Sequence, residues 1–189
     1  GSQDRKRYVH NFLAGLQSPV FKTLGLPQIL VWLALAGTIV FGIGLRSIHL
    51  TDVTSRSPDE RVYTYFARRI ANEGVSASPK LFYEYVNARQ AWDYPPPTRI
   101  TTVFLNAAIM TVADLRDERA GVFVSWLFSC LSLILLACVG VRLFNPWIAL
   151  TAVLFMAVSM TELGIARRAW QDTTFGFFSL LLFYVACEI

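Results

Sequence analysis

A charged heptapeptide, Ser57-Pro58-Asp59-Glu60-Arg61-Val62-Tyr63, holds the residue types in this sequence that are best suited to chemistry. It sets two adjacent carboxylates beside a guanidinium, just after the first strongly apolar stretch of the chain. A carboxylate can act as a general base, and a guanidinium can bind an anion. The heptapeptide therefore predicts chemistry at a membrane face, with Asp59 and Glu60 as candidate catalytic residues.

The same heptapeptide also has a purely structural interpretation. Ser57 with Glu60 three residues later is the pattern of a capping box, and Pro58 falls at the first helical position. A helix is therefore expected to begin here and to end at Gly74, with an apolar stripe suited to a membrane surface. Because the helix dipole favours carboxylates in the first turn, capping alone would account for Asp59 and Glu60.

The elements that must position these residues are membrane helices. Of 189 residues, 54% are apolar and 14% are aromatic, and the mean hydropathy is +0.46. Charges gather in islands, and the uncharged runs between them approach the ~20 helical residues that cross a hydrocarbon core of roughly 30 Å. These runs are apolar on all sides, which favours helices over the alternating strands of a barrel. The predicted fold class is an all-α integral membrane protein with about four to five membrane helices.

Charged flanks set the expected boundaries. Residues 1–26 form a basic cytoplasmic or interfacial segment, in which Val9 to Lys22 is mildly amphipathic, and the first span follows and ends at Arg46. Residues 46–98 form the first extracytoplasmic loop. The later apolar runs are Ile100 to Ala113, Ala120 to Val141, Trp147 to Thr161 and Thr173 to Cys187. The last run is short for a span, so the chain is expected to be part of a longer protein.

The loop and the later charge islands carry further candidate binding residues. An aromatic-rich helix is expected from Pro79 to about Trp92, and three prolines are expected to make Trp92-Asp93-Tyr94-Pro95-Pro96-Pro97-Thr98-Arg99 a rigid extended segment. Arg167 and Arg168 lie shortly before Asp172. An acid as close to a span as Asp172 is costly without a partner or a water-filled cavity, which favours a functional role for it.

The order of these motifs resembles the N-terminal half of the GT-C superfamily, the integral-membrane glycosyltransferases that use polyprenyl-phosphate sugars. Protein O-mannosyltransferases and the lipid A aminoarabinose transferase are its most similar members. Asp59-Glu60 matches the acidic pair that the family places in its first extracytoplasmic loop. Arg61 and Tyr63 resemble the aminoarabinose transferase pattern.

Three later motifs extend the resemblance over residues 27–189. Asp93 with Pro95-Pro96 is similar to the family's acidic residue and Pro-Pro pair, and Arg119 to its arginine at the start of the third span. The family's Arg-x-x-x-x-Asp island is matched by Arg167 or Arg168 with Asp172. The family often has Lys or His before Pro-Pro, and this chain departs from it with Tyr94.

The resemblance implies transfer of a sugar from a polyprenyl-phosphate donor to an acceptor hydroxyl at the extracytoplasmic face of a bacterial inner membrane. Asp59 would be the base, and attack on the anomeric carbon would displace polyprenyl phosphate. The residues expected to bind phosphate are Arg61, Arg99, Arg167 and Arg168. Asp93 and Asp172 would hold a divalent cation or orient those arginines. The expected partners are membrane lipid, the donor, and a protein, lipid or glycan acceptor, with no nucleic acid.

Two alternatives remain open at this point. A non-catalytic membrane subunit or a truncated fragment of such an enzyme is the strongest rival, and a piece of a transporter or channel is less favoured because the charges gather at membrane edges. If every apolar run crossed the membrane, Asp59 and Asp172 would lie on opposite sides. We expect the short run from Trp147 to Thr161 not to cross fully, so that both acids face one extracytoplasmic cavity.

Overall fold

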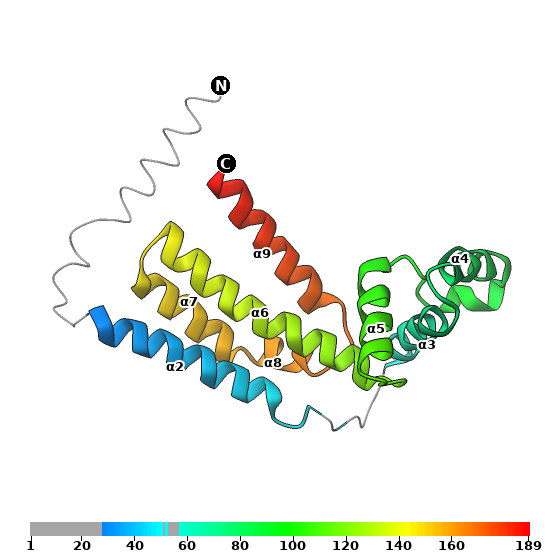
Figure 1. Ribbon diagram of the computed structural model, residues 1–189, viewed down its shortest axis with the longest axis horizontal. Coiled ribbons are helices and arrows are strands. Elements are labelled where there is room, and N and C mark those ends of the chain that lie inside the picture. The colour runs from blue at the N-terminus through cyan, green and yellow to red at the C-terminus, as the bar shows by residue number, and fades with distance from the viewer. Residues whose placement is uncertain (1–27, 51, 53–56) are drawn as a thin grey trace.

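The computed structural model describes residues 28–50, 52 and 57–189, and within them all regular structure is helical. The amphipathic segment expected from Val9 to Lys22 lies outside these residues. Four helices form a bundle: α2 (Gln28–Ser47), α6 (Arg119–Leu143), α7 (Pro146–Val158) and α9 (Asp172–Glu188). Figure 1 shows them side by side, with the remaining helices gathered at one end.

Contacts between the bundle helices fix their directions. Gly42 of α2 lies against Ala157 of α7, and both helices reach this level near their C-terminal ends, so α2 and α7 run parallel. Leu133 of α6 also approaches Gly42, whereas Gly140 further along α6 meets Ala149 at the start of α7. Helix α6 is therefore antiparallel to both.

The position of α9 follows from contacts at its two ends. Ser125 near the start of α6 donates a hydrogen bond to the carbonyl oxygen of Trp170, which precedes α9, and Arg142 near the end of α6 pairs with Glu188. Helix α9 thus runs parallel to α6. Phe128 packs against Phe177 and Phe178 of α9, with ring centroids 5.3 and 5.7 Å apart.

Small residues let the bundle helices approach one another closely. A Cβ atom added at Gly140 would lie 2.7 Å from the Cα atom of Ala149, and one added at Gly42 would lie 2.9 Å from the Cβ atom of Ala157. Lipid provides no hydrophobic drive for helices to associate, so close van der Waals packing through small residues is a main source of stability there. Ala149, Val153 and Ala157 lie along one face of α7, and all three are completely buried.

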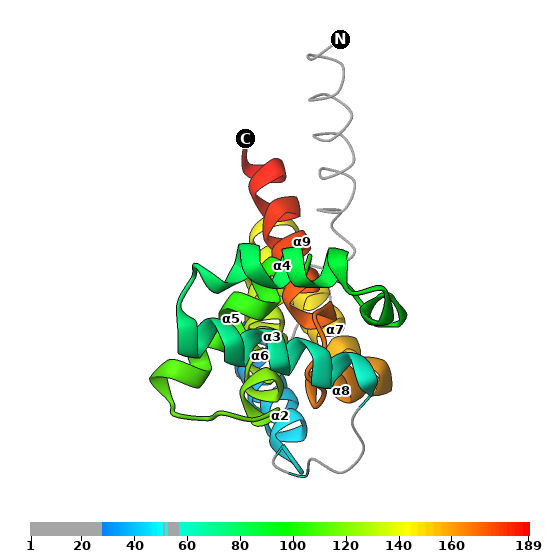
Figure 2. The same cartoon turned by 90° about the vertical axis from the view of Figure 1, so that its right-hand side faces the viewer.

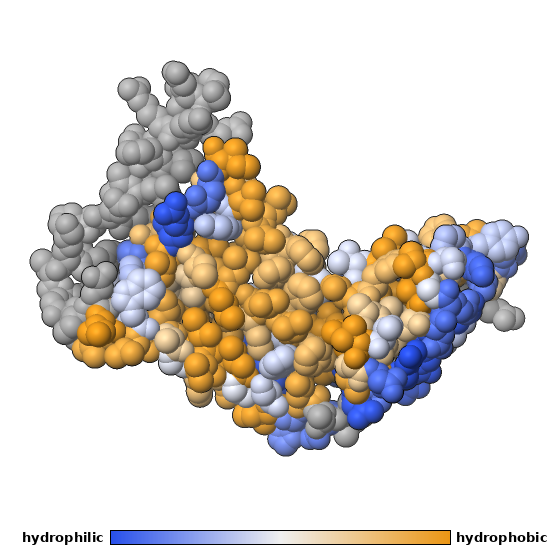
Figure 3. Space-filling model, viewed as in Figure 1, coloured by the Kyte–Doolittle hydropathy of each residue, from blue (hydrophilic) through white to orange (hydrophobic). Residues whose placement is uncertain are grey.

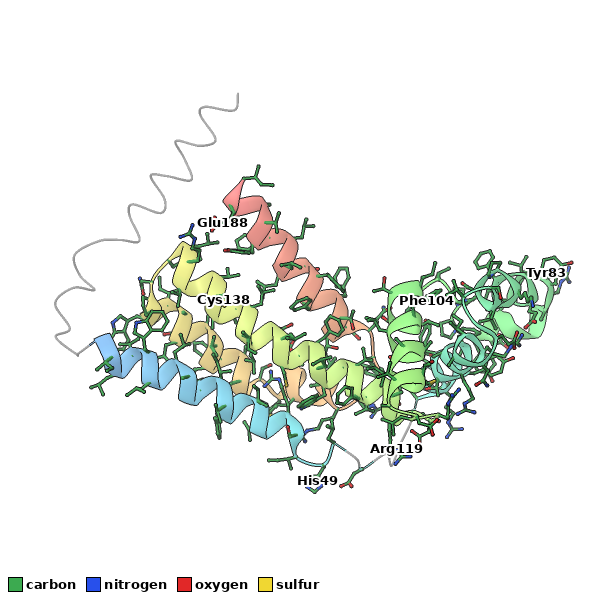
Figure 4. The ribbon with its side chains drawn as sticks, in the orientation of Figure 1. His49, Tyr83, Phe104, Arg119, Cys138 and Glu188 are labelled. Atoms are coloured by element: carbon green, nitrogen blue, oxygen red, sulfur yellow. The ribbon has the colours of Figure 1, made fainter. Side chains whose placement is uncertain are left out.

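The bundle has two chemically different ends. The motif end is formed by Ser47, Arg119, Val158 and Asp172, and the far end by Leu143, Pro146 and Glu188. In Figure 4, Arg119 marks the motif end, and Cys138 and Glu188 lie toward the far end. Figure 2 views the bundle from the motif end, where α3 (Pro58–Glu73) and α4 (Ala77–Asn87) lie across it.

Local sequence signals explain where α3 and α4 begin and end. The expected capping box is present: Ser57 Oγ accepts a hydrogen bond from the Glu60 amide at 3.4 Å, and Glu60 Oε2 accepts one from the Ser57 amide at 3.2 Å. Gly74, with φ of 79°, ends α3 as predicted. Helix α4 is shorter than the expected Pro79 to Trp92 helix, because a 3-10 helix, η2 (Arg89–Asp93), replaces its last turn.

Helix α5 (Ile100–Val112) stays at the motif end. It packs on α3 through a shared core that includes Tyr63, Ala67 and Met110, and it meets only the beginning of α6, where Asn106 lies against Gly121. The chain therefore leaves α5 at the same end of the bundle at which it entered. Two buried polar side chains, Thr102 and Asn106, suit this contact with protein better than contact with lipid.

The expectation that the run from Trp147 to Thr161 does not cross fully stays a prediction, because a bent helix pair can be a broken span or a re-entrant segment. Helix α7 runs from the far end to the motif end, and a 62° bend then leads into α8 (Met160–Ala166). The run Ile100–Val112 enters and leaves at the motif end. Because hydropathy measures the length and polarity of a run and not its direction, the sequence did not show that this run stays at one end.

Two of the described helices, α2 over Ile29–Ser47 and α6, are long and apolar enough to cross a membrane, and α7 with α8 makes a third if the bent pair counts as one span. On the face of the molecule shown in Figure 3, most of the bundle surface is apolar, and hydrophilic residues concentrate along the outer edge of the α3–α4 region. The all-helical prediction is confirmed for the described residues. A count of four to five spans remains a prediction.

Candidate functional site

An ion pair joins the acidic motif to the basic island. Glu60 is 0% exposed, and its Oε1 atom accepts a hydrogen bond of 2.8 Å from Nε of Arg168, which lies 108 residues later in the chain. The other carboxylate oxygen belongs to the capping box. Two sequence motifs that are separated along the chain by α5 and by two bundle helices, α6 and α7, are thus in direct contact at the motif end.

Asp59 has the opposite environment to its neighbour. Its side chain is exposed in the first turn of α3, on the side of the helix that carries Tyr63. The guanidinium of Arg99 lies 4.8 Å from the centroid of the Tyr63 ring. Burial raises the pKa of Tyr63, the charge of Arg99 opposes this rise, and the charge of Asp59 adds to it. Asp59, Tyr63 and Arg99 therefore form one electrostatically coupled group beside the ion pair.

A groove of about 490 Å³ opens next to this group. One wall is residues 98–102, which lead into α5, and the other is the beginning of α9 with Thr174, Phe175 and Phe178. Thr174 is 3% exposed, and its hydroxyl has no hydrogen-bond partner among the described residues. The groove thus offers one guanidinium and several hydroxyls on a polar side and two phenyl rings on an apolar side.

Asp172 stands beside this groove in the first turn of α9, one residue after Gln171 in the groove wall. Its side chain is exposed, as is that of Asp59. Both acids lie at the motif end, but neither is among the residues that line this groove, so the expectation that they face one extracytoplasmic cavity stays a prediction.

Arg61, Tyr94 and Asp93 lie away from this groove. Arg61 and Tyr94 line a second groove of about 480 Å³ with Pro58, Val62 and Tyr65 on another face of α3. Asp93 is exposed at the end of η2 and lines neither groove. The described residues contain no group of three or more His, Cys, Asp or Glu side chains placed to hold a metal ion. The predicted pairing of Asp93 with Asp172 in a cation site therefore gains no support from the geometry.

Two arginines behave differently from the expectation based on sequence. Arg167, predicted to bind phosphate, donates a hydrogen bond of 2.6 Å from Nη2 to the carbonyl oxygen of Leu45, and its Nε atom is buried with no partner among the described residues. Arg46, interpreted only as the charged flank of the first span, is 0% exposed and forms a network inside the bundle. Nothing in the sequence signals that Arg46 points inward, because a flanking arginine and a buried one look alike.

Comparison of the chain with protein-family models, with curated proteins and with solved structures found no match. The functional assignment therefore depends on the geometry of the motif end. That end combines an exposed carboxylate, a paired buried one, a stacked guanidinium and a groove with one polar and one apolar side.

Proposed function

We propose that this protein is a membrane glycosyltransferase, or part of one, that transfers a sugar from a polyprenyl-phosphate donor to an acceptor hydroxyl. The single observation that carries the proposal is the Glu60–Arg168 ion pair, which brings the acidic motif and the basic island together at one end of an apolar bundle. A reaction between a lipid-linked sugar and a water-borne or surface acceptor needs such a position, because its two substrates come from different phases.

The groove between residues 98–102 and α9 is suited to the donor. Arg99 and the exposed residues Thr98 and Thr101 supply a guanidinium and two hydroxyls for phosphate oxygens, and a guanidinium is well matched to that charge. Phe175 and Phe178 lead from the polar part of the groove onto α9, where large apolar side chains such as Leu182 are exposed and would accompany a polyprenyl tail. Neutralisation of the phosphate by Arg99 would stabilise it as a leaving group.

Asp59 is the proposed general base. The acceptor oxygen would attack the anomeric carbon and transfer its proton to the Asp59 carboxylate, while the bond from that carbon to the phosphate oxygen breaks and the electron pair leaves with polyprenyl phosphate. The exposure of Asp59 allows an acceptor to reach it, and Arg99 lies nearby across Tyr63. Glu60 would act indirectly, by holding Arg168. No step is assigned to a divalent cation.

The second groove is available to the acceptor. It lies beside the first turn of α3, and Arg61 and Tyr94 supply polar contacts there. We place the motif end on the extracytoplasmic side of a bacterial inner membrane, with the N-terminus in the cytoplasm, following the positive-inside rule. Cysteines introduced at positions 59 and 172 should both react with a membrane-impermeant reagent added from outside. Labelling of either position from the cytoplasmic side alone would contradict this arrangement.

The reaction is tested by transfer from a radiolabelled polyprenyl-phosphate sugar. Asp59→Asn should lower the transfer rate by about 10²- to 10⁴-fold, because it removes the base and preserves shape. Asp114→Asn is the matched control, since this carboxylate is 90% exposed in the turn between α5 and α6 and lies outside both grooves. Full activity of Asp59→Asn would remove Asp59 from the reaction.

A non-catalytic membrane subunit is the second candidate. The observation that favours it is the structural engagement of Glu60, which caps α3 and pairs with Arg168 at the same time. Such a subunit would bind the donor lipid without transferring its sugar. Donor binding together with an absence of transfer would support this alternative and contradict the first proposal.

A further inference from the structure

Arg46 is a completely buried cation at the end of the first membrane helix. Its Nε atom donates a hydrogen bond of 2.7 Å to Ser129 Oγ of α6, and Nη1 donates one of 3.1 Å to the carbonyl oxygen of Gly42, one turn earlier in α2. Nη1 and Nη2 also bind the carbonyl oxygens of Ala157 and Met156, at 3.3 and 3.0 Å. The guanidinium thus ties three helices together at one point.

The two α7 carbonyls that Arg46 binds lie where that helix ends. The last carbonyl groups of an α-helix lack partners within the helix and carry partial negative charge, so a cation there is favourable. Residue Ser159 follows with extended backbone, and the chain then bends by 62° into α8. Arg46 replaces the hydrogen bonds that α7 loses at this bend.

Arg167 makes the converse contact. It follows α8 and binds the carbonyl oxygen of Leu45, in the last turn of α2. An arginine of α2 therefore binds the end of α7, and an arginine after α8 binds the end of α2. These two contacts, which we call the arginine brace, fix the chain on both sides of α8.

The arginine brace determines where Arg168 lies. Arg168 is the next residue after Arg167, and its Nε atom binds Glu60. The groove wall begins three residues further, at Gln171. A change in the direction of α8 would therefore move both the partner of Glu60 and the groove.

We propose that Arg46 is a positioning residue: by binding the carbonyl groups at the end of α7 it sets the bend into α8 and thereby holds Arg168 on Glu60 and the start of α9 at the groove. The effect on catalysis rests on the proposed transferase function. The structural effect does not. Arg46 is 0% exposed and lines neither groove, so it acts through these contacts and not on a substrate.

Distances between spin labels test the proposal without any measurement of transfer. One pair, at Met160 of α8 and Val75 after α3, reports the position of α8, and a second pair, at Leu33 of α2 and Leu182 of α9, reports the bundle away from the bend. All four positions are at least 63% exposed. The exposed cysteines Cys138 and Cys187 are replaced by alanine, and the buried Cys130 is retained.

Arg46→Met keeps much of the side-chain length and removes every donor. We expect it to broaden the Met160–Val75 distance distribution and shift its mean, while the Leu33–Leu182 distribution stays unchanged. Arg46→Lys should give an intermediate result, because an ammonium group reaches some of the carbonyl oxygens but lacks the planar fork of the guanidinium. Such partial rescue distinguishes carbonyl binding from simple filling of volume.

An unchanged Met160–Val75 distribution in Arg46→Met would overturn the proposal, and so would equal broadening of both pairs, which would indicate general loss of packing. If Arg46→Met does not fold, Arg46→Lys decides by the same criteria, because it loses the planar fork that binds the two α7 carbonyl oxygens. In the transfer assay, Arg46→Lys should raise the donor KM, whereas Asp59→Asn should lower kcat. If the parent protein shows no transfer, the proposed effect of Arg46 on catalysis is wrong. The proposed effect on the direction of α8 is still decided by the distances.

Discussion

The motif end and the far end of the bundle hold their helix ends and turns in place by different interactions. At the far end, Asn145 caps α7 by accepting hydrogen bonds from the amides of Trp147 and Ile148, and Gly140 packs directly on Ala149. The ion pair there, Arg142 with Glu188, is exposed. At the motif end, helix ends and turns are held instead by the buried or half-buried side chains of Arg46, Glu60, Arg167 and Arg168.

This difference shows that stability alone does not require the buried charges. A short capping side chain and close contact between small residues are enough to join α6 to α7. Buried charges are costly unless well paired, and replacing them with apolar residues is often neutral or favourable for stability. The buried charges lie at the same end as the grooves and the exposed carboxylate Asp59. This common position supports a functional role for the motif end.

The largest loss of stability is expected when the Glu60–Arg168 pair at the motif end is broken. Arg168→Ala removes the cation from a carboxylate that is 0% exposed, and should lower the free energy of unfolding by about 2 kcal/mol. Arg168 itself is 37% exposed, which keeps the effect below that of a fully buried pair. Denaturant unfolding in detergent, with a double-mutant cycle to Glu60→Gln, measures it. Additive effects in that cycle would show that the two side chains are not coupled.

The far end should be sensitive to volume and not to charge. Gly140→Ala places a Cβ atom 2.7 Å from the Ala149 backbone, which cannot move without shifting α7, and should cost about 1 to 2 kcal/mol. Gly37→Ala is the matched control, because nothing lies within 4 Å of a Cβ atom there. It should remain within about 1 kcal/mol of the parent. The two variants are compared by the same denaturant titration, and equal stability would argue against the close α6–α7 contact.

An alkaline titration of stability tests whether Tyr63 is buried at the motif end. Burial raises the pKa of Tyr63 above its usual value of 10.0 in the folded protein. The resulting stabilisation is fully present below the unfolded-state pKa and is lost as the pH rises through the folded-state pKa. Tyr63→Phe should therefore flatten the decline of the unfolding free energy as the pH rises above about 10. It should cost little at neutral pH, because the buried hydroxyl has no partner among the described residues.

Tyr83→Phe is the control for that titration, since Tyr83 is 72% exposed on α4. It should leave the alkaline slope as in the parent protein. The same slope in the parent and in Tyr63→Phe would show that the Tyr63 ring is reached by water.

The smallest effect is expected for Arg142→Ala. The pair with Glu188 lies at the exposed surface of the far end, where ion pairs contribute little. The midpoint of denaturant unfolding should match that of the parent protein. A loss as large as that of Arg168→Ala would remove the distinction between the two ends.

The sequence predicted the local features of this structure well. Ser57 and Glu60 marked the start of α3, and Gly74 marked its end. Each of these signals acts within a few residues, so it can be recognised without knowledge of the tertiary structure.

The sequence did not show which side chains face inward. From the sequence, the adjacent carboxylates Asp59 and Glu60 are equally good candidates for a catalytic role. In the structure Asp59 is exposed, whereas Glu60 is buried and pairs with Arg168. The two carboxylates differ in exposure because α3 packs against α5 and against the turn after α8. These contacts join distant parts of the chain. The same reason hid the inward direction of Arg46 and the reversal of the chain at α5.

The arginine brace also bears on how the protein is made. Arg46 finds its α7 acceptors only 110 and 111 residues later, which corresponds to roughly 5 to 20 seconds of synthesis. A guanidinium is costly inside hydrocarbon, so we expect the side chain to lie at the level of lipid headgroups during this interval. Helix α2 is therefore synthesised well before the segment of α7 that completes its contacts.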